Sequence, residues 1–251
     1  MVLLLLVDLD ADLAALRPLG GFFLLRTGAA PRSSLPTLAQ VYDIEKKDVY
    51  GNSITFRVQK TRDALRAPEP RIAASVAQQG LAARLWSAAL GCAVLYGRIP
   101  DLDARLVRWD ADGSAPDDLW LTEVRPLPGD AATLAEAVLE GHLEPLAAAL
   151  RTRYRVATGL LRGNAASALA GAARQLEGWA RAHGRSDAAA RTRALTAELF
   201  THPLLTGTGT LTGTAFRRRS CCLYYRVPGG GVCGDCCFAR PPRSSPGAAS
   251  G

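Results

Sequence analysis

The sequence is short of aromatic and histidine residues and contains no long apolar run. Aromatic residues make up only 6% of the 251 residues, so alanine and leucine must fill most of the core, which favours helices. His142, His183 and His202 lie far apart and none has a metal-ligand spacing to another, so we interpret them as single core or surface residues. No apolar run reaches the roughly 18–20 residues of a membrane span, so we expect no transmembrane helix.

Signatures of nucleotide chemistry are missing as well. No G-x-G-x-x-G fingerprint follows an expected strand, and Gly207-Thr208-Gly209-Thr210 lacks the lysine and the helix of a phosphate loop. We also find no nucleophile–base arrangement. The net charge of +7 invites a nucleic-acid interpretation, but the arginines are spread along the chain and aromatic residues do not alternate with them. We therefore expect no nucleic-acid partner and no built-in flavin or nicotinamide site.

What the chain does have is a dense group of cysteines. Five of the six lie between Cys221 and Cys237, with the spacing C-C-x10-C-x2-C and one further thiol at Cys237. Disulfides suit small secreted chains, and adjacent cysteines cannot pair without strain. The apolar stretch Met1–Val7 is too short for a signal-peptide core and is ended by Asp8. We therefore expect a reducing compartment, the cytoplasm, either free or peripheral at the inner face of the membrane.

Zinc and an iron–sulfur cluster remain as partners for the thiolates. Cys233-Gly234-Asp235-Cys236 is a good chelating turn, and four thiolates make a closed tetrahedral zinc site. The other half, with two thiols on neighbouring residues, fits the usual C-x2-4-C zinc loop less well. A two-iron cluster is wider than one ion and tolerates a less regular ligand set, so the spacing favours iron–sulfur and leaves zinc open.

The segment from Arg218 to Arg226, continued by Gly234-Asp235-Cys236, resembles the C-terminal signature of the FhuF-like ferric-siderophore reductases. The resemblance implies a [2Fe–2S] cluster held by Cys221, Cys222, Cys233 and Cys236. Cys237 has no counterpart in that ligand set. Weaker similarity extends over four further segments, which are Gly80–Trp86, Gly91–Leu102, His142–Leu146 and Gly163–Leu169.

The resemblance further implies one-electron reduction of a ferric siderophore, with a hydroxamate type as one option, and electrons from an external ferredoxin or reductase. Two groups of residues are candidates for docking the substrate or the donor. The basic group beside the cysteines consists of Arg217, Arg218, Arg219 and Arg226; the group in family-like segments consists of Arg84, Trp86, Tyr154, Arg155 and Asn164. The alternatives are an electron relay or iron sensor without enzymatic activity, and a zinc-stabilised binding module.

For the fold we expect the α+β class, with a mainly helical C-terminal body, a small antiparallel sheet in the N-terminal half and an irregular cysteine segment. The expected parts are an α+β part at 1–128 with an atypical, lysine-bearing stretch at 40–60, a helical part at 129–205, an iron–sulfur segment at 206–240 and a disordered tail at 241–251.

Periodicity and capping residues place the elements within these parts. Expected strands are Phe22–Leu25, a hairpin from Asp48 to Val58, Ala93–Tyr96, Ala104–Trp109 and Leu119–Val124. Expected helices are Ile72–Leu90, a helix capped by Asp130 and running to Glu140, one with Pro145 in its first turn, Asn164–His183 stopped by Gly184, and Ser186–Phe200. Thr206–Thr214 is expected to be an irregular hinge.

Overall fold

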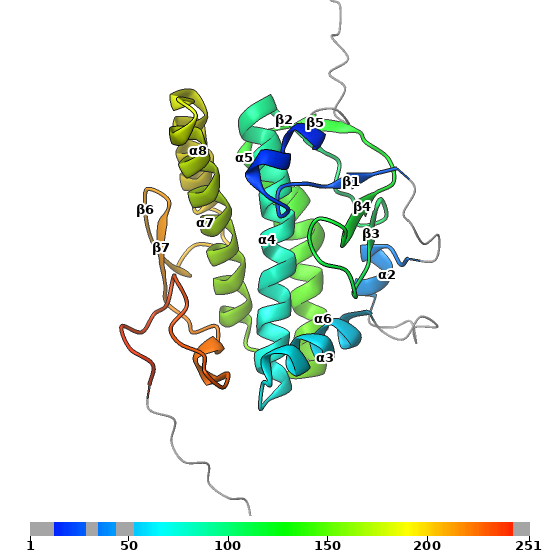
Figure 1. Cartoon of the computed structure of the whole chain (residues 1–251), viewed down its shortest axis with the longest axis vertical. Helices are drawn as coiled ribbons and strands as arrows, with labels where there is room; N and C mark the ends of the chain where they lie inside the picture. Colours follow the sequence, from blue (N-terminus) through cyan, green and yellow to red (C-terminus); the bar gives the residue numbers. More distant parts are fainter. Residues whose placement is uncertain (1–12, 29–34, 44–52, 243–251) are drawn as a thin grey trace, which may run out of the picture.

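Two long helices that run side by side in the same direction form the centre of the molecule, as the computed structural model shows for residues 13–28, 35–43 and 53–242 (Figure 1). α4 (Pro70–Tyr96) and α7 (Thr158–Ala182) pack along each other. α4 begins with a proline in its first turn and ends at Gly97, whose φ of 71° is the left-handed conformation that glycine adopts without strain. Because most of α4 is apolar or small on every side, the helix is buried nearly all round.

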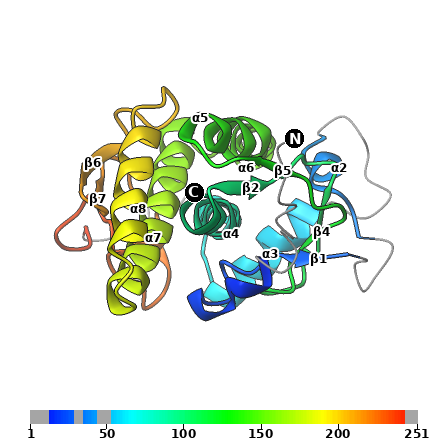
Figure 2. The ribbon, with the colours of Figure 1, turned by 90° about the horizontal axis from the view of Figure 1, so that it is seen from above.

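Shorter helices surround this pair. α3 packs on one side of α4, and α8 packs on α7 (Figure 2). The α5 helix continues without interruption into the π-helix η2 and then into α6. The bounds are α2 (Leu38–Tyr42), α3 (Ser53–Leu65), α5 (Ala131–Leu134), η2 (Ala135–Leu143), α6 (Glu144–Tyr154) and α8 (Ser186–Leu199), with 3₁₀ turns η1 (Arg17–Leu19) and η3 (Tyr224–Arg226).

The strands are short and form three small sheets. In the first, the central strand β4 pairs antiparallel with β3 and parallel with β1; β2 pairs antiparallel with β5, and β6 with β7. The bounds are β1 (Arg26–Thr27), β2 (Arg98–Pro100), β3 (Val107–Trp109), β4 (Leu119–Leu121), β5 (Pro126–Pro128), β6 (Gly209–Thr212) and β7 (Ala215–Arg218). None of the helices in the described ranges combines the length and apolar character needed to cross a membrane.

The expected fold class is confirmed: the chain is α+β, mainly helical, with small sheets. The side chain of Asp130 accepts a hydrogen bond from the amide of Thr133 at 2.9 Å and so caps α5. Pro145 lies in the first turn of α6, and Gly184 has a φ of 67° just after α7. These positions were found from local chemistry alone, because a cap or a stop depends on few neighbours.

Four expected elements are wrong. Phe22–Leu25 forms turn and irregular backbone, and the strand begins only at Arg26. Residues 53–58 of the expected hairpin are helical in α3, where Ile54 and Val58 are buried four residues apart on one helix face. The remaining hairpin residues 48–52 lie outside the described residues.

The other two wrong predictions concern Ala93–Tyr96 and Thr206–Thr214. Ala93–Tyr96 is the last turn of α4, because an apolar run of this length fits a buried helix as well as a strand. Thr206–Thr214 contains β6, which pairs with β7 as a regular hairpin, and Gly213 provides a positive φ of 60° in the turn.

One hydrophobic core cluster contains residues of both the 1–128 and the 129–205 parts, so the core does not separate these two parts. The domain boundaries stay predictions. Residues 243–251 of the expected tail lie outside the described residues.

Candidate metal centre

The β6–β7 hairpin brings the cysteine segment, defined as residues 219–238, onto the helical body (Figure 1). Phe216 of β7 is buried and packs against Phe200 with ring centroids 5.1 Å apart. Only glycine fits at position 209, because a Cβ there would lie 2.3 Å from the carbonyl oxygen of Arg217. The close backbone approach thus holds the two strands of the hairpin together, and the aromatic contact fastens the hairpin to the body.

Directly after the cysteine pair the backbone makes a strained turn. Leu223 has a φ of 69°, a left-handed conformation that costs a non-glycine residue roughly 1–2 kcal/mol. The turn points the amide of Leu223 at the sulfur of Cys221, with an N–Sγ distance of 3.2 Å. In the same way the amide of Phe238 donates to Cys236 Sγ at 3.4 Å. Strain held at such a place is typical of functional sites.

The sulfur atoms lie in one small region. Cys222 Sγ is 3.5 Å from Cys233 Sγ, and the chelating turn is closed by the hydrogen bond from Cys236 N to Cys233 O at 3.0 Å. The hydrogen bond between these two thiols lowers the pKa of Cys222 to about 7 and raises the pKa of Cys233. Burial is the main cause of the raised pKa values of Cys221 and Cys237.

Arg218 is a buried cation beside these thiols. Its side chain is almost fully buried, and its positive charge lowers the pKa of Cys222 and opposes the rise for Cys233. Nη2 donates to the side-chain oxygen of Asn164, whereas Nε and Nη1 have no hydrogen-bond partner in the described part of the chain. A buried guanidinium with two unsatisfied nitrogens fits an anionic group that is bound next to it.

A polar network ties Cys222 to both central helices. Ser75 Oγ of α4 donates to Cys222 O at 2.8 Å, and Asn164 Nδ2 of α7 donates to Ser75 O and Oγ at 2.9 and 3.0 Å. Asn164 also accepts the hydrogen bond from Arg218. Asn164, one of the expected docking residues, is fully buried within this network.

The chelating turn has its own anchor on α7. The buried carboxylate of Asp235 accepts a hydrogen bond from Ser167 Oγ at 2.6 Å and forms an ion pair with Arg174 Nη1 at 2.9 Å. Its backbone oxygen accepts from the amide of Arg218 at 2.9 Å. Sequence reasoning missed Ser75, Ser167 and Arg174, because nothing local marks a serine or an arginine that contacts a segment far along the chain.

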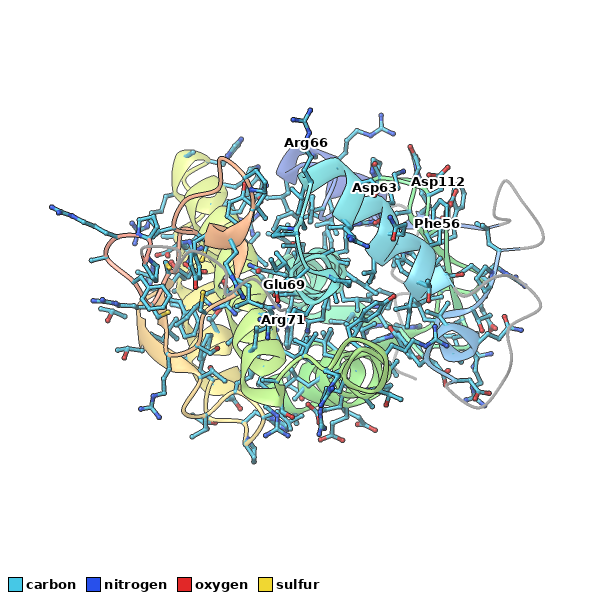
Figure 3. The ribbon with its side chains drawn as sticks, turned by 90° about the horizontal axis from the view of Figure 1, so that it is seen from below. Phe56, Asp63, Arg66, Glu69, Arg71 and Asp112 are labelled. Carbon is cyan, nitrogen blue, oxygen red and sulfur yellow. The ribbon has the colours of Figure 1, made fainter. Side chains whose placement is uncertain are left out.

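The expected docking residues lie in different places. Arg217 and Arg219 are exposed beside the cysteine segment, and Arg226 forms an ion pair with Glu69 at 2.8 Å. In Figure 3, Glu69 and Arg71 lie at the N-terminal end of α4, between α3 and the cysteine segment.

The candidates in the helical body are separate from this group. Arg84 and Trp86 are buried in α4, whereas Tyr154 is half-buried and Arg155 is exposed at the end of α6. Whether any of these nine residues docks a partner stays a prediction.

The donor set fits a two-iron cluster. Four terminal thiolates are shared between the two irons of such a cluster. Amide donors near sulfur together with a buried cation suit an anionic cluster.

Comparison with known proteins supports the same class of site. The segment is of the iron–sulfur type: residues 218–238, which include all five clustered cysteines, match the family model of the FhuF 2Fe-2S C-terminal domain. The resemblance of this segment to the FhuF-like family is thereby confirmed, and the cofactor is a [2Fe–2S] cluster rather than zinc. No curated protein matches the chain.

Proposed function

We propose that this protein is a ferric-siderophore reductase that passes one electron to siderophore-bound Fe(III). The observation that carries the proposal is the match of residues 218–238 to the FhuF 2Fe-2S C-terminal domain, with the C-C-x10-C-x2-C thiols inside it. A siderophore holds Fe(III) with hard anionic oxygens and holds Fe(II) far more weakly, so one electron releases the metal without hydrolysis. When bound, a [2Fe–2S] cluster supplies one-electron chemistry of matching stoichiometry.

In this proposal Cys221, Cys222, Cys233 and Cys236 hold the irons, and Cys237 is a spare thiol. Arg218 stabilises the added negative charge from a buried position, which makes acceptance of an electron more favourable. The amides of Leu223 and Phe238 act in the same direction through their hydrogen bonds to sulfur. Each rise of ~59 mV in the reduction potential of the cluster changes a one-electron equilibrium constant tenfold.

An external protein, a ferredoxin or a reductase, delivers the electrons. The sequence has no dinucleotide fingerprint, so a built-in hydride donor is not part of the proposal. The exposed Arg217 and Arg219 would attract an acidic donor or an anionic chelate. The thiolates require a reducing compartment, and we place the protein in the cytoplasm for that reason.

The test uses anaerobic, cluster-loaded protein that has been reduced with dithionite and freed of excess reductant. Addition of a ferric hydroxamate should restore the visible absorption of the oxidised cluster and release one Fe(II) per cluster, captured by an Fe(II)-specific dye. A control with the gallium(III) hydroxamate should leave the cluster reduced, because Ga(III) accepts no electron. Failure of ferric chelates to reoxidise the protein would refute the reductase.

A second candidate is an electron relay or iron sensor that acts through another protein. Three large apolar residues of the cysteine segment are exposed, Tyr224, Val232 and Phe238, and such exposure beside a redox site is typical of a protein-docking surface. Rapid reoxidation by a partner protein combined with none by ferric chelates would favour this candidate.

A further inference from the structure

A cavity of about 370 Å³ lies on the far side of α4 from the cysteine segment. Its walls come from α3, α4, the turn before β1, and β3 with the loop that follows it. The residues used below are Phe22, Arg57, Gly80, Arg84, Trp109 and Asp118. This volume falls within the range of small-molecule sites, about 300–1,000 Å³. Nothing in the cysteine chemistry accounts for this cavity.

The cavity contains one positive charge, that of Arg57, which no carboxylate of the described residues neutralises. Arg84 and Asp118 pair with each other at 2.8 Å, and further hydrogen bonds from Arg84 to backbone carbonyls satisfy its guanidinium. Arg57 donates only to the carbonyl oxygen of Gly113, at 2.8 Å, and forms no ion pair with any described residue. Its remaining N–H groups are available to an anionic ligand.

Aromatic rings line the same cavity. Arg57 lies over the ring of Trp109, 5.7 Å from its centroid, and Phe22 is 42% exposed in a chain with few aromatic residues. Aromatic walls favour a planar ring that stacks on them or meets them edge-on. The combination of two aromatic side chains and one unpaired guanidinium therefore selects an aromatic group that carries a negative charge.

The cavity and the cysteines flank the same helix. Ser75 contacts Cys222, whereas Arg84, nine residues further along α4, points about 180° away around the helix axis. Figure 3, which looks along α4 from its N-terminal end, shows α3 on one side and the cysteine segment on the other. A ligand in the cavity is thus separated from the thiols by at least one helix diameter, roughly 10–12 Å, and the nine-residue step from Ser75 to Arg84 adds up to about 13.5 Å along the helix axis.

We propose that this cavity binds an anionic aryl arm, such as a phenolate or aryl carboxylate, of the ferric chelator that the protein reduces. The aryl ring lies against Trp109 and Phe22, and Arg57 hydrogen-bonds its anionic oxygens. The identity of the chelate as substrate rests on the proposed function, whereas binding of the aryl anion rests on the cavity alone. This substrate class differs from the hydroxamate type, which the resemblance gave as one option.

The test is equilibrium dialysis of the cluster-loaded protein against salicylate, its neutral amide and the gallium(III)–salicylate chelate. Gly80→Leu fills the cavity, because a Cβ at Gly80 meets open space at an exposed helical position. Gly178→Leu is the matched control on α7, since Gly178 is also helical, exposed and unobstructed. Arg57→Gln removes the cation.

We expect wild type and Gly178→Leu to bind salicylate and the gallium chelate equally, and Gly80→Leu to bind both at least about tenfold more weakly. Arg57→Gln should weaken salicylate about tenfold or more and leave the neutral amide unchanged. The same Kd for salicylate in wild type and Gly80→Leu, or in wild type and Arg57→Gln, overturns the proposal.

The remaining outcomes separate the two proposals. Binding of salicylate without binding of the gallium chelate assigns the cavity to a free aromatic acid and overturns the chelate assignment. Binding of the gallium chelate, combined with no reoxidation of the reduced protein by the iron(III) chelate, supports the cavity and refutes the reductase.

Discussion

The helical body and the cysteine segment are held by different kinds of interaction. α4 and α7 bury apolar side chains along most of their length. Within residues 219–238 only Cys222, Val227 and Asp235 are buried, and the segment is fastened mainly by hydrogen bonds and ion pairs. A segment with so little apolar burial depends on its bound metal for order, because metal binding contributes directly to folding free energy.

This comparison predicts that the body folds without the cluster and that the segment does not keep its structure without it. The largest effect should come from Cys222→Ser. Loss of this thiolate should abolish the red-brown colour and the iron and acid-labile sulfide content. Limited proteolysis should then cut within 219–238, whereas the far-ultraviolet circular dichroism of the helices stays the same.

Cys237→Ser is the matched control, because it removes a neighbouring thiol outside the proposed ligand set. It should retain colour, iron and protease resistance. Full iron content in Cys222→Ser, or loss of iron in Cys237→Ser, would contradict the ligand assignment.

The second-largest effect is expected on the stability of the helical body. Leu169 is fully buried in α7, and Leu169→Ala should lower the free energy of unfolding by about 2–5 kcal/mol, measured by urea denaturation. Val232→Ala, in the exposed part of the cysteine segment, should change it by less than about 0.5 kcal/mol. Equal effects of the two substitutions would mean that the segment is part of the same apolar core.

How far the sequence predicts the molecule depends on how local each signal is. The cysteine spacing, the Asp130 cap and the stop at Gly184 involve neighbouring residues and were found. The helical state of 53–58 depends on which side of the chain meets α4, and Ile54, Phe56 and Val58 also alternate as in a strand. Ile54 and Val58 are buried whereas Phe56 is exposed, and only the tertiary contacts decide this.

The metal centre shows the same limit of local sequence signals. The sequence indicated the thiols and a basic cluster beside them, but it could not tell that Arg218 is buried while Arg217 and Arg219 are exposed. That alternation follows from the pairing of β7 with β6, a hairpin that the Gly/Thr-rich composition concealed. Contacts of Ser75 and Ser167 with the cysteine segment span long stretches of chain and leave no local pattern.

Asp235→Asn should break the polar anchor of the cysteine segment. Its effect on stability should be smaller than that of Leu169→Ala. The substitution removes the charge that faces Arg174 and weakens the hydrogen bond from Ser167. The free energy of local unfolding of the cysteine segment should decrease by about 1–3 kcal/mol. Amide hydrogen exchange of residues 219–238 should accelerate while α4 and α7 stay protected. Asp187→Asn, which removes an exposed carboxylate paired with Arg185, should leave the exchange unchanged. Unchanged exchange in Asp235→Asn would show that apolar contacts or the cluster alone hold the turn.

The last expected effect separates the two regions by pH. His142 is fully buried in η2. In its neutral form the ring donates from Nε2 to Leu102 O at 2.5 Å and accepts at Nδ1 from the hydroxyl of Tyr42 at 3.0 Å. Burial lowers the pKa of His142 from 6.5 to about 4, although the hydrogen bond to Leu102 and the charge of Asp103 oppose this. Because the unfolded chain takes up the proton first as the pH falls, stability is full above pH 6.5 and decreases towards pH 4.

The slope should reach at most about 1.4 kcal/mol per pH unit between pH 6 and 5, measured by urea denaturation of the body. His142→Gln should abolish this slope, since its amide does not titrate and retains a donor for Leu102 O. The cysteine segment contains no histidine. The free energy of local opening of this segment, measured by hydrogen exchange, should therefore not change with pH by the same slope. A slope that survives in His142→Gln would assign the pH dependence to another group, and a matching slope in the segment would mean that the two regions unfold as one unit.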